Sequence, residues 1–355
     1  MTEKTLEIMK ELTQIVGISG DEKEVSKALA AHYKGLCDEV IYDNLGSIFA
    51  VKKCGKENAK RVMVCAHMDE VGFMITEIHD NGLLSFIKIG DIADGAMYGS
   101  RVTLKTREGK ELTGAIVADA DTLEKGEGKK MKIDLGCASK KEVEDLGVFV
   151  GDSAVISGDF VQVQNRVFAK AWDNRFGCTL TVELLEALKD VELDYDLYIG
   201  ASVMEEVGIR GGTSATGLIH PDMGIVLDCS AANDYAGKED EVGKIGKGVL
   251  VRYYDKGMMP NRGLLDELVR VCKENNIDYQ YFYNMEQTDA AWIHKLFSGC
   301  PTLSVCICAR GIHTASTMID LHDYDCAKEA AYKVLSELNE EEIEIRLAID
   351  KRASL

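Results

Sequence analysis

The residues in this sequence best placed to do chemistry begin with His67 and Asp69. They follow the apolar, β-branched run 62–66, which is typical of a buried parallel strand, and ligands collect past the carboxyl ends of such strands. The imidazole of His67 can bind a metal ion there, while Asp69 can hold the ring in one tautomer. The pattern His-x-Asp is common, however, and a histidine at a strand end is equally often a hydrogen-bonded structural residue. Other parts of the chain must supply further ligands.

More acidic and histidine side chains follow other expected strands or stand at strand–helix junctions: Asp173, Glu205, Glu206, Asp228 and His313. Strand ends gather at one edge of an α/β sheet, so these side chains are expected to meet. Two histidines, two aspartates and two glutamates are the set that a two-metal hydrolase uses. Two divalent ions roughly 3.5–4 Å apart polarise a shared water toward hydroxide. Imidazole and carboxylate ligands favour zinc, cobalt or manganese over calcium.

The glutamate pair adds to this interpretation because adjacent residues point in different directions. One glutamate can bind metal while the other moves a proton. Each site also has an ordinary explanation on its own. Asp173 could be a helix N-cap, the pair Glu205 and Glu206 a solvated turn, Asp228 another cap and His313 a loop residue. Their joint occurrence at the ends of apolar strands favours the metal site.

Two different patterns of expected secondary structure occur along the chain, and they predict two domains. Residues 1–67 and 166–355 alternate apolar strands with helices, which predicts an α/β domain with a mostly parallel sheet sandwiched by helices. Helical spacing of Leu6, Met9, Leu12 and Val16 predicts a first helix, and the pattern Ser-x-x-Glu at 19–22 reads as a capping box for a second one. Strands are expected at 39–42, 48–52, 61–66, 196–204, 223–228, 249–254, 279–283 and 302–308, and further helices at 175–188, from 211, and at 261–274, 290–296 and 323–338. Residues 340–355 receive no assignment.

Residues 68–165 instead show short strands at close spacing without a convincing long helix. Strands are expected at 83–89, 101–105, 112–117 and 154–157, and Asn81-Gly82 reads as a hairpin turn. This segment is predicted to be a small, barrel-like all-β domain inserted into the α/β domain.

The composition excludes several classes of function. The 355 residues carry a net charge of −19, which argues against nucleic acid or an anionic membrane as a partner. No apolar stretch is long enough to cross a membrane, and the acidic N-terminus does not resemble a signal peptide. The eleven cysteines include no Cys-x-x-Cys and read as reduced core residues. We therefore expect a cytoplasmic protein. A serine hydrolase or nucleotide-binding protein is disfavoured because the sequence has neither Gly-x-Ser-x-Gly nor a glycine-rich phosphate loop.

Four motifs together resemble one family over nearly the whole chain: AHMDEVGF at 66–73, WDNR at 172–175, EEVGIRG at 205–211 and RGIHT at 310–314. In order and spacing they are similar to the tetrahedral-assembly metallo-aminopeptidases of metallopeptidase family 42, which include glutamyl and deblocking aminopeptidases. The resemblance implies a zinc-peptidase-like catalytic domain. It also implies a cytoplasmic enzyme that removes N-terminal residues from short peptides.

The resemblance further implies a role for each matching residue. Asp173 would bridge two divalent ions (Zn²⁺ or Co²⁺, with Mn²⁺ as an alternative), and a hydroxide bridging them would be the nucleophile. His67 and Asp228 would complete one metal site, and Glu206 and His313 the other. Glu205 would be the general base and then the acid, and Asp69 would orient His67. The insertion at 68–165 would mediate dimer contacts, and dimers would assemble into a dodecamer.

The sequence departs from the family pattern at Gly311, Thr317, Tyr235 and Gln287. None is a proposed ligand, but their loops are expected to border the substrate pocket, so side-chain preference is left open. Alternatives are a dinuclear-metal carboxypeptidase or N-acyl-amino-acid deacylase, a glycanase, and a non-catalytic peptide-binding shell protein. A glycanase is disfavoured because the adjacent residues Glu205 and Glu206 could hardly flank a sugar bond.

Overall fold

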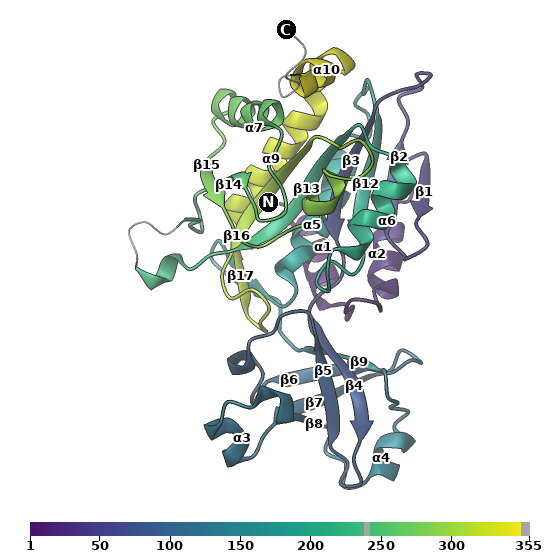
Figure 1. Ribbon diagram of the computed structural model, residues 1–355, viewed down its shortest axis with the longest axis vertical. Coiled ribbons are helices and arrows are strands. Elements are labelled where there is room, and N and C mark those ends of the chain that lie inside the picture. The colour runs from purple at the N-terminus through teal and green to yellow at the C-terminus, as the bar shows by residue number, and fades with distance from the viewer. Residues whose placement is uncertain (238–241, 349–355) are drawn as a thin grey trace.

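The computed structural model describes residues 1–237 and 242–348. Figure 1 shows an α/β part with a β-barrel below it. Both parts were expected from the sequence, and the fold class is confirmed. No helix within the described ranges is long and apolar enough to cross a membrane.

An eight-stranded sheet forms the centre of the α/β part, in the order β1-β2-β12-β3-β13-β16-β14-β15. Its inner strands β12, β3, β13 and β16 are parallel to their neighbours in this series, and β14 pairs with β15 in the same way. The pairs β1–β2, β2–β12 and β14–β16 are antiparallel. The strands are β1 (Glu39–Tyr42), β2 (Ile48–Lys52), β3 (Arg61–His67), β12 (Asp196–Ser202), β13 (Met223–Ala231), β14 (Val249–Tyr254), β15 (Tyr279–Tyr283) and β16 (Thr302–Ala309).

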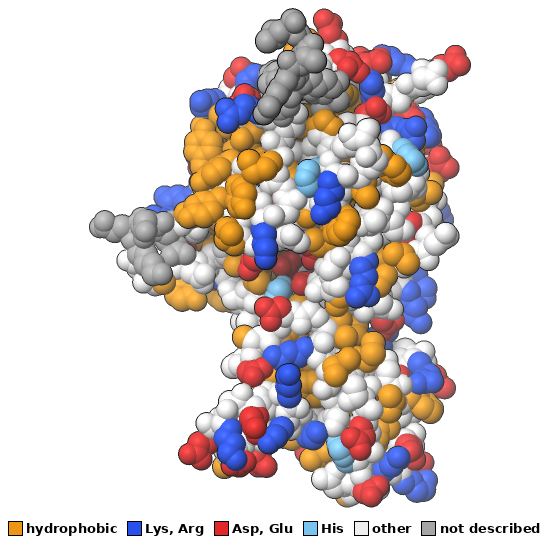
Figure 2. Space-filling view, viewed as in Figure 1, with side chains coloured by type: hydrophobic (Ala, Val, Ile, Leu, Met, Phe, Trp, Pro, Cys, Tyr) orange, Lys and Arg blue, Asp and Glu red, His pale blue; other side chains and the backbone are white. Residues whose placement is uncertain are grey.

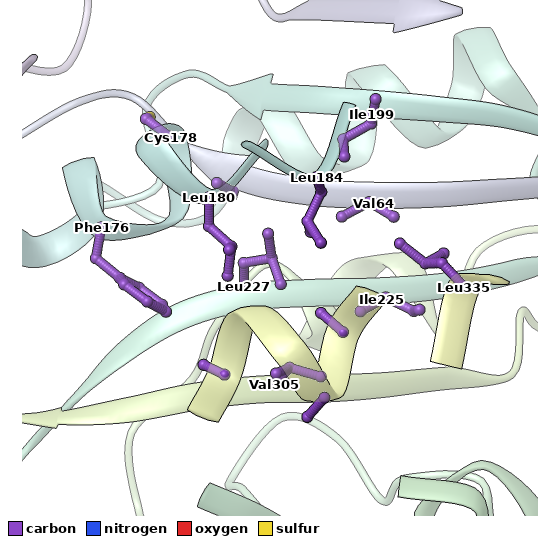
Figure 3. Packing of buried hydrophobic residues seen from close by; sticks show 14 of the residues in the cluster. Val64, Phe176, Cys178, Leu180, Leu184, Ile199, Ile225, Leu227, Val305 and Leu335 are labelled. Atoms are coloured by element: carbon purple, nitrogen blue, oxygen red, sulfur yellow. The ribbon is translucent and has the colours of Figure 1, made fainter. Parts of the chain in front are cut away.

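Helices cover both faces of this sheet because its strands are apolar on both faces. Val62 and Val64 pack into the larger core, whereas Met63 and Cys65 pack into a core on the opposite face. Figure 3 shows Leu180 and Leu184 of α5 beside Val64 in the larger core. That face carries α1 (Glu3–Gln14), α2 (Lys23–Tyr33), α5 (Trp172–Ala187), α7 (Arg262–Glu274) and α9 (Leu321–Glu337), and the opposite face carries α6 (Arg210–Ile219) and α8 (Ala290–Ile293).

The strands between residues 72 and 156 close into a barrel, in the order β4-β5-β8-β7-β6-β9. It has its own core, which includes Phe73, Leu84 and Val102. Gly82, with φ +83°, forms the expected hairpin turn. The elements are β4 (Gly72–Ile78), β5 (Leu84–Ile89), β6 (Arg101–Lys105), β7 (Glu111–Val117), β8 (Lys132–Asp134), β9 (Ser153–Ile156) and the short helices α3 (Ala120–Glu124) and α4 (Lys140–Asp145).

A separate three-stranded antiparallel sheet, β10-β11-β17, was not foreseen. It consists of β10 (Val161–Val163), β11 (Arg166–Ala169) and β17 (Thr317–Asp320). β11 leads from the barrel into α5, and β17 follows the loop that carries His313, so this small sheet joins two segments that bear candidate site residues. Single 3₁₀ turns occupy Asp94–Ala96, Gly128–Lys130 and Asp234–Ala236.

Several details of the sequence-based predictions are wrong. β12 ends at Ser202 rather than at 204, and β4 and β8 were not expected as strands. α5 is assigned from Trp172, but Asp173 and Asn174 are not helical, so its regular part begins at Arg175, as predicted. The prediction of a capping box is also wrong, because α2 begins at Lys23 and has no side-chain cap. The unassigned tail contains α10 (Glu340–Ala348), and 349–355 lie outside the described residues.

Candidate metal centre

His67 and Asp228 come together because their strands are parallel neighbours. Cys65 of β3 pairs with Val226 of β13, so His67 and Asp228 each lie two residues further on and point to the same face of the sheet. The Nε2 atom of His67 lies 3.7 Å from Oδ1 of Asp228. Both side chains are buried. Register alone therefore brings one imidazole and one carboxylate to the carboxyl edge of the sheet.

Asp173 enters from the start of α5, where the backbone is not helical. Asp173 and Asn174 have non-helical φ and ψ, and the peptide bond between them is cis. The amide of Asn174 donates to the carbonyl of Leu227 at 2.7 Å, and its Oδ1 accepts from the N–H of Gly177 at 3.0 Å. Asn174 therefore anchors this turn to the end of β13. The Asp173 side chain makes no capping bond to α5.

Asp173 is the member that two groups of candidate ligands share. Its Oδ1 lies 3.0 Å from Nε2 of His67, and its Oδ2 lies 3.4 Å from Nε2 of His313. The same nitrogen of His313 lies 3.2 Å from Oε1 of Glu206. One group contains His67, Asp173 and Asp228, and the other contains Asp173, Glu206 and His313; within each, the potential ligand atoms lie within 4.8 Å of one another.

The surroundings of both imidazoles leave Nε2 facing the centre. The Nδ1 atom of His313 lies 2.7 Å from the carbonyl oxygen of Asp91, which can only accept a hydrogen bond. That nitrogen therefore carries the proton. In His67, Nδ1 lies 3.3 Å from Oδ1 of Asp69, and a carboxylate there favours the same tautomer. Each ring is thus oriented with its Nε2 atom toward the centre.

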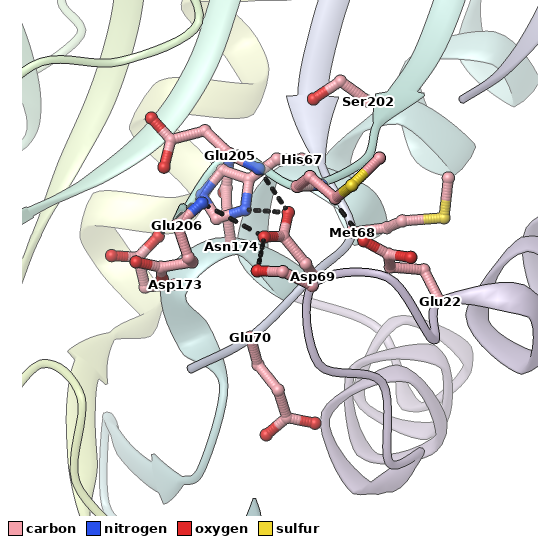
Figure 4. A network of polar contacts seen from close by, with 12 residues as sticks. Glu22, His67, Met68, Asp69, Glu70, Asp173, Asn174, Ser202, Glu205 and Glu206 are labelled. Atoms are coloured by element: carbon pink, nitrogen blue, oxygen red, sulfur yellow. Dashed lines mark hydrogen bonds and ion pairs between the residues drawn. The ribbon is translucent and has the colours of Figure 1, made fainter. Parts of the chain in front are cut away.

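Asp69 is fully buried and holds more than one element of the centre (Figure 4). Its two oxygens accept the backbone N–H groups of Glu205 and Glu206, at 3.0 and 3.1 Å. The hydroxyl of Ser19 donates to Oδ2 of Asp69 at 2.7 Å. The contacts to Ser19 and to the two amides were not foreseen from the sequence. Of this network, the sequence indicated only the proximity of Asp69 to His67.

The centre contains more negative charge than the protein balances. Burial raises the pKa of Asp228 and of Glu206, and the charge of Asp173 raises both further. Burial would lower the pKa of His313, but the carboxylates of Asp173 and Glu206 outweigh it and raise that pKa to about 11. His67 behaves in the same way: its pKa is raised despite burial, mainly by Asp173 and Asp69. Both imidazoles are thus in sites that favour positive charge.

The residues present fit divalent cations. Among the described residues, no lysine or arginine forms an ion pair with Asp173, Glu205, Glu206 or Asp228. Oε1 of Glu206 is buried without a hydrogen-bond partner. Uncompensated buried carboxylates are costly, and bound cations would remove this cost. Imidazole and carboxylate donors suit zinc, cobalt or manganese.

Glu205 differs from its neighbour because it belongs to neither group of candidate ligands. Burial raises the pKa of Glu205; the nearby His67 opposes this, while Asp228 and Glu206 raise the pKa further. A carboxylate with a raised pKa beside a metal centre is suited to accepting and returning a proton near neutral pH.

A second buried cluster consists of residues that lie close to the candidate ligands in sequence: Glu70, Lys170 and Arg175. Nζ of Lys170 lies 2.7 and 2.9 Å from the two oxygens of Glu70, and Nη2 of Arg175 lies 3.4 Å from one of them. Arg175 also donates to the carbonyl of Met68 at 2.9 Å. This cluster fixes the loop after His67 against the start of α5. The motifs at 66–73 and 172–175 contained Glu70 and Arg175, but nothing in the sequence indicated this role.

Figure 2 shows acidic and histidine side chains in a hollow between the α/β part and the barrel. A helix-covered sheet with an acidic, histidine-containing centre at its carboxyl edge defines the chain as a metal-dependent hydrolase. The sequence pattern of the M42 glutamyl aminopeptidase family matches residues 46–329. The chain belongs to the M42 family, and it is a metal-dependent peptide hydrolase.

Several characterised proteins are similar along their whole length. Glutamyl aminopeptidase of Lactococcus lactis is 33% identical over 94% of this chain and 97% of its own. A TET aminopeptidase from a marine sediment archaeon has a TM-score of 0.92 at 32% identity, covering 97% of this chain and 100% of that one. The TET1 peptidase of Pyrococcus horikoshii, which can assemble into a tetrahedron or a large octahedral shell, has a TM-score of 0.85 at 28% identity, covering 94% and 100%. The expected family is therefore confirmed.

Proposed function

We propose that this chain is a two-metal aminopeptidase that removes N-terminal residues from short peptides. The observation that carries this proposal is the position of Asp173, whose two oxygens face two different groups of candidate ligands. A single carboxylate shared in this way is what a pair of neighbouring ions requires. Membership of a family described as glutamyl aminopeptidases supports peptide N-termini as the substrate.

In this proposal each residue has one role. Asp173 would hold both ions, His67 and Asp228 would complete one site, and Glu206 and His313 would complete the other. The ions are Zn²⁺ or Co²⁺, with Mn²⁺ as an alternative. Asp69 orients His67 and holds the 205–206 turn through its amides.

Bound divalent ions would polarise the scissile carbonyl and lower the pKa of a water molecule. Glu205 accepts the proton of the attacking water at its carboxylate and donates it to the leaving amine. The adjacent Glu206 cannot share this task, because its carboxylate faces His313.

We also propose that the protein is a cytoplasmic homo-oligomer. Residues 68–165, between the two catalytic segments 1–67 and 166–355, would form the dimerisation domain, and dimers would assemble into a dodecamer. The shells formed by the similar TET1 peptidase support this proposal. Measuring the mass of the particle in solution by light scattering tests it.

Two adjacent substitutions test the assignment of roles. Glu205→Gln is expected to keep its metal content and lower kcat by about 10²–10⁴-fold, which is the usual contribution of a general base. Glu206→Gln is expected to lower metal content itself, measured by elemental analysis after dialysis. A Glu205→Gln enzyme with substantial turnover would remove Glu205 from the mechanism.

The substrate class needs its own assay. Peptides with a free N-terminus should be cleaved, and the same peptides with an acetylated N-terminus should resist cleavage. A panel of aminoacyl-anilides with several divalent metals would then give side-chain preference and the most active ion. Preference for acetylated substrates, or release of C-terminal residues, would refute the aminopeptidase assignment.

A further inference from the structure

The turn that carries Glu205 and Glu206 is held in an unfavourable backbone conformation. Met204, directly before the pair, has φ +53°, and Ile209, at its end, has φ +57°. Neither residue is a glycine, so both occupy the left-handed region against their preference. Such residues persist only where the surroundings fix them, and they cluster at functional sites. The groups that hold this turn therefore matter for where the carboxylate of Glu205 lies.

Three consecutive backbone N–H groups of this turn donate to buried carboxylates. The N–H groups of Glu205 and Glu206 donate to Asp69. The N–H group of Met204 donates to Oε1 of Glu22, at 3.0 Å. Glu22 comes from the segment before α2, 182 residues earlier in the chain.

The side chain of Glu22 is committed to this contact. It is only 5% exposed, and besides Met204 its Oε1 accepts the N–H group of Gly20 at 2.9 Å. It makes no capping bond to α2, which begins at the next residue. In the described part of the chain it forms no ion pair with lysine or arginine. A buried carboxylate without a cation is costly, and hydrogen bonds from N–H groups offset part of that cost.

The segment that carries Glu22 also supplies Ser19, whose hydroxyl donates to Asp69. One short stretch before α2 therefore supports both carboxylates on which the turn rests. Figure 4 shows Glu22 and Asp69 approaching the centre from the same side. Neither Ser19 nor Glu22 is a candidate metal ligand, so metal binding does not explain their positions.

We propose that Glu22 is a positioning residue for catalysis: by binding the N–H group of Met204 it holds the turn so that Glu205 faces the reacting water. This inference rests on the proposed role of Glu205. Without the acceptor, the N–H group of Met204 loses its partner and the turn keeps only the two N–H contacts to Asp69, so Glu205 is expected to shift. A misplacement of about 1 Å can lower a rate by about 10²-fold.

The test compares variants of the full-length, metal-loaded enzyme, assayed with excess metal well below the unfolding temperature. Glu22→Ala is expected to lower kcat by about 10–100-fold while KM changes by less than about 2-fold, because substrate binding does not depend on the base. Glu22→Asp should behave similarly, since its shorter side chain falls short of Met204. Glu22→Gln should restore most of the activity, because its Oε1 accepts the same two N–H groups.

Glu24→Ala is the matched control, because Glu24 lies two residues further on, in the first turn of α2, where its side chain is 40% exposed and pairs with Lys27. It should leave kcat unchanged. Wild-type kcat in both Glu22→Ala and Glu22→Asp would overturn the inference. So would equal losses in Glu22→Gln and Glu22→Ala, or recovery of Glu22→Ala at higher metal concentration.

Glu205→Gln, measured in parallel, separates the two proposals. If it stays active, the proposed role of Glu205 fails, and the positioning inference fails with it. If it is inactive while Glu22→Ala and Glu22→Asp match the wild type, only the positioning inference fails.

Discussion

Two buried acidic clusters lie next to each other in this protein, and they differ in where their positive charge comes from. Glu70 contacts Lys170 and Arg175, so its carboxylate is neutralised by the chain itself. The candidate metal centre contains Asp173, Glu206 and Asp228, whose nearest basic groups are two imidazoles. The two clusters even alternate in sequence, with Asp69 beside Glu70 and Asp173 two residues before Arg175.

The source of the positive charge distinguishes a structural cluster of buried carboxylates from a functional one. A buried carboxylate that the chain neutralises needs no other partner, and it can tie loops together permanently. A buried carboxylate that the chain leaves without a cation either takes up a proton or binds a cation from solution. This reasoning assigns Glu70 to the scaffold and Asp173 to the candidate metal centre, although both lie in motifs shared with the family.

The largest effect should come from breaking the neutralised cluster. Lys170→Met leaves Glu70 buried with only Arg175 near it, so the free energy of unfolding should fall by about 3–5 kcal/mol. Urea denaturation of the metal-loaded protein measures this. Lys4→Met is the control, because Lys4 forms an exposed ion pair with Glu186 and should cost less than about 1 kcal/mol. Equal losses in the two variants would mean that burial does not distinguish these pairs.

Removing metal should destabilise the candidate metal centre, because the described residues supply no lysine or arginine to its carboxylates. Chelation leaves its carboxylates without cations, so the unfolding temperature should fall and should return when metal is restored. Ions present at about 100 times their Kd would contribute about 2.7 kcal/mol. Calorimetry with and without chelator measures the difference.

Two histidine variants serve as the test and the control for the chelation experiment. The metal-dependent shift should shrink in His67→Ala and persist in His32→Ala, because His32 pairs with Glu11 on the surface. If the chelator does not change the unfolding temperature of the wild-type protein, the electrostatic interpretation is contradicted.

Glu22 provides a third and smaller case, a buried carboxylate that only N–H groups solvate. Burial, with a contribution from the nearby Asp69, raises the pKa of Glu22 from 4.5 to about 7. The folded state therefore holds this proton more tightly than the unfolded state. The resulting stabilisation is complete below about pH 4.5 and is lost as the pH rises through about 7.

Glu22→Gln cannot lose a proton, so its stability relative to the wild type should rise between pH 5 and pH 8. The expected gain is about 2–3 kcal/mol, measured by urea denaturation at several pH values. Glu24→Gln, which changes an exposed residue, should show a much smaller change. A pH-independent difference between Glu22→Gln and the wild type would mean that Glu22 does not titrate in this range.

Much of the architecture could be predicted from the sequence because it depends on local periodicity. Apolar runs predicted the strands of the main sheet, and the change of texture after residue 68 predicted the inserted all-β segment. His67 and Asp228 could be predicted to meet, because strand ends of a parallel sheet share one edge. β4 was missed because it follows immediately after the residues that were interpreted as the site.

The contacts that hold the site could not be predicted, since they join residues far apart in the chain. Ser19 and Glu22 match a local capping box, yet their side chains bind Asp69, 50 residues away, and Met204, 182 residues away. A pattern of two residues cannot distinguish these outcomes. The pairing of Glu70 with Lys170, 100 residues apart, has no local signal at all.

The insertion of the barrel between His67 and Asp173 has a consequence for synthesis. A ribosome makes His67 first, then the whole barrel, and only afterwards Asp173, which both groups share. The group with Asp228 has all its members once 228 residues have been made, whereas the group with Glu206 waits for His313. The two halves of the centre therefore become available in a fixed order, with the group that contains Asp228 first.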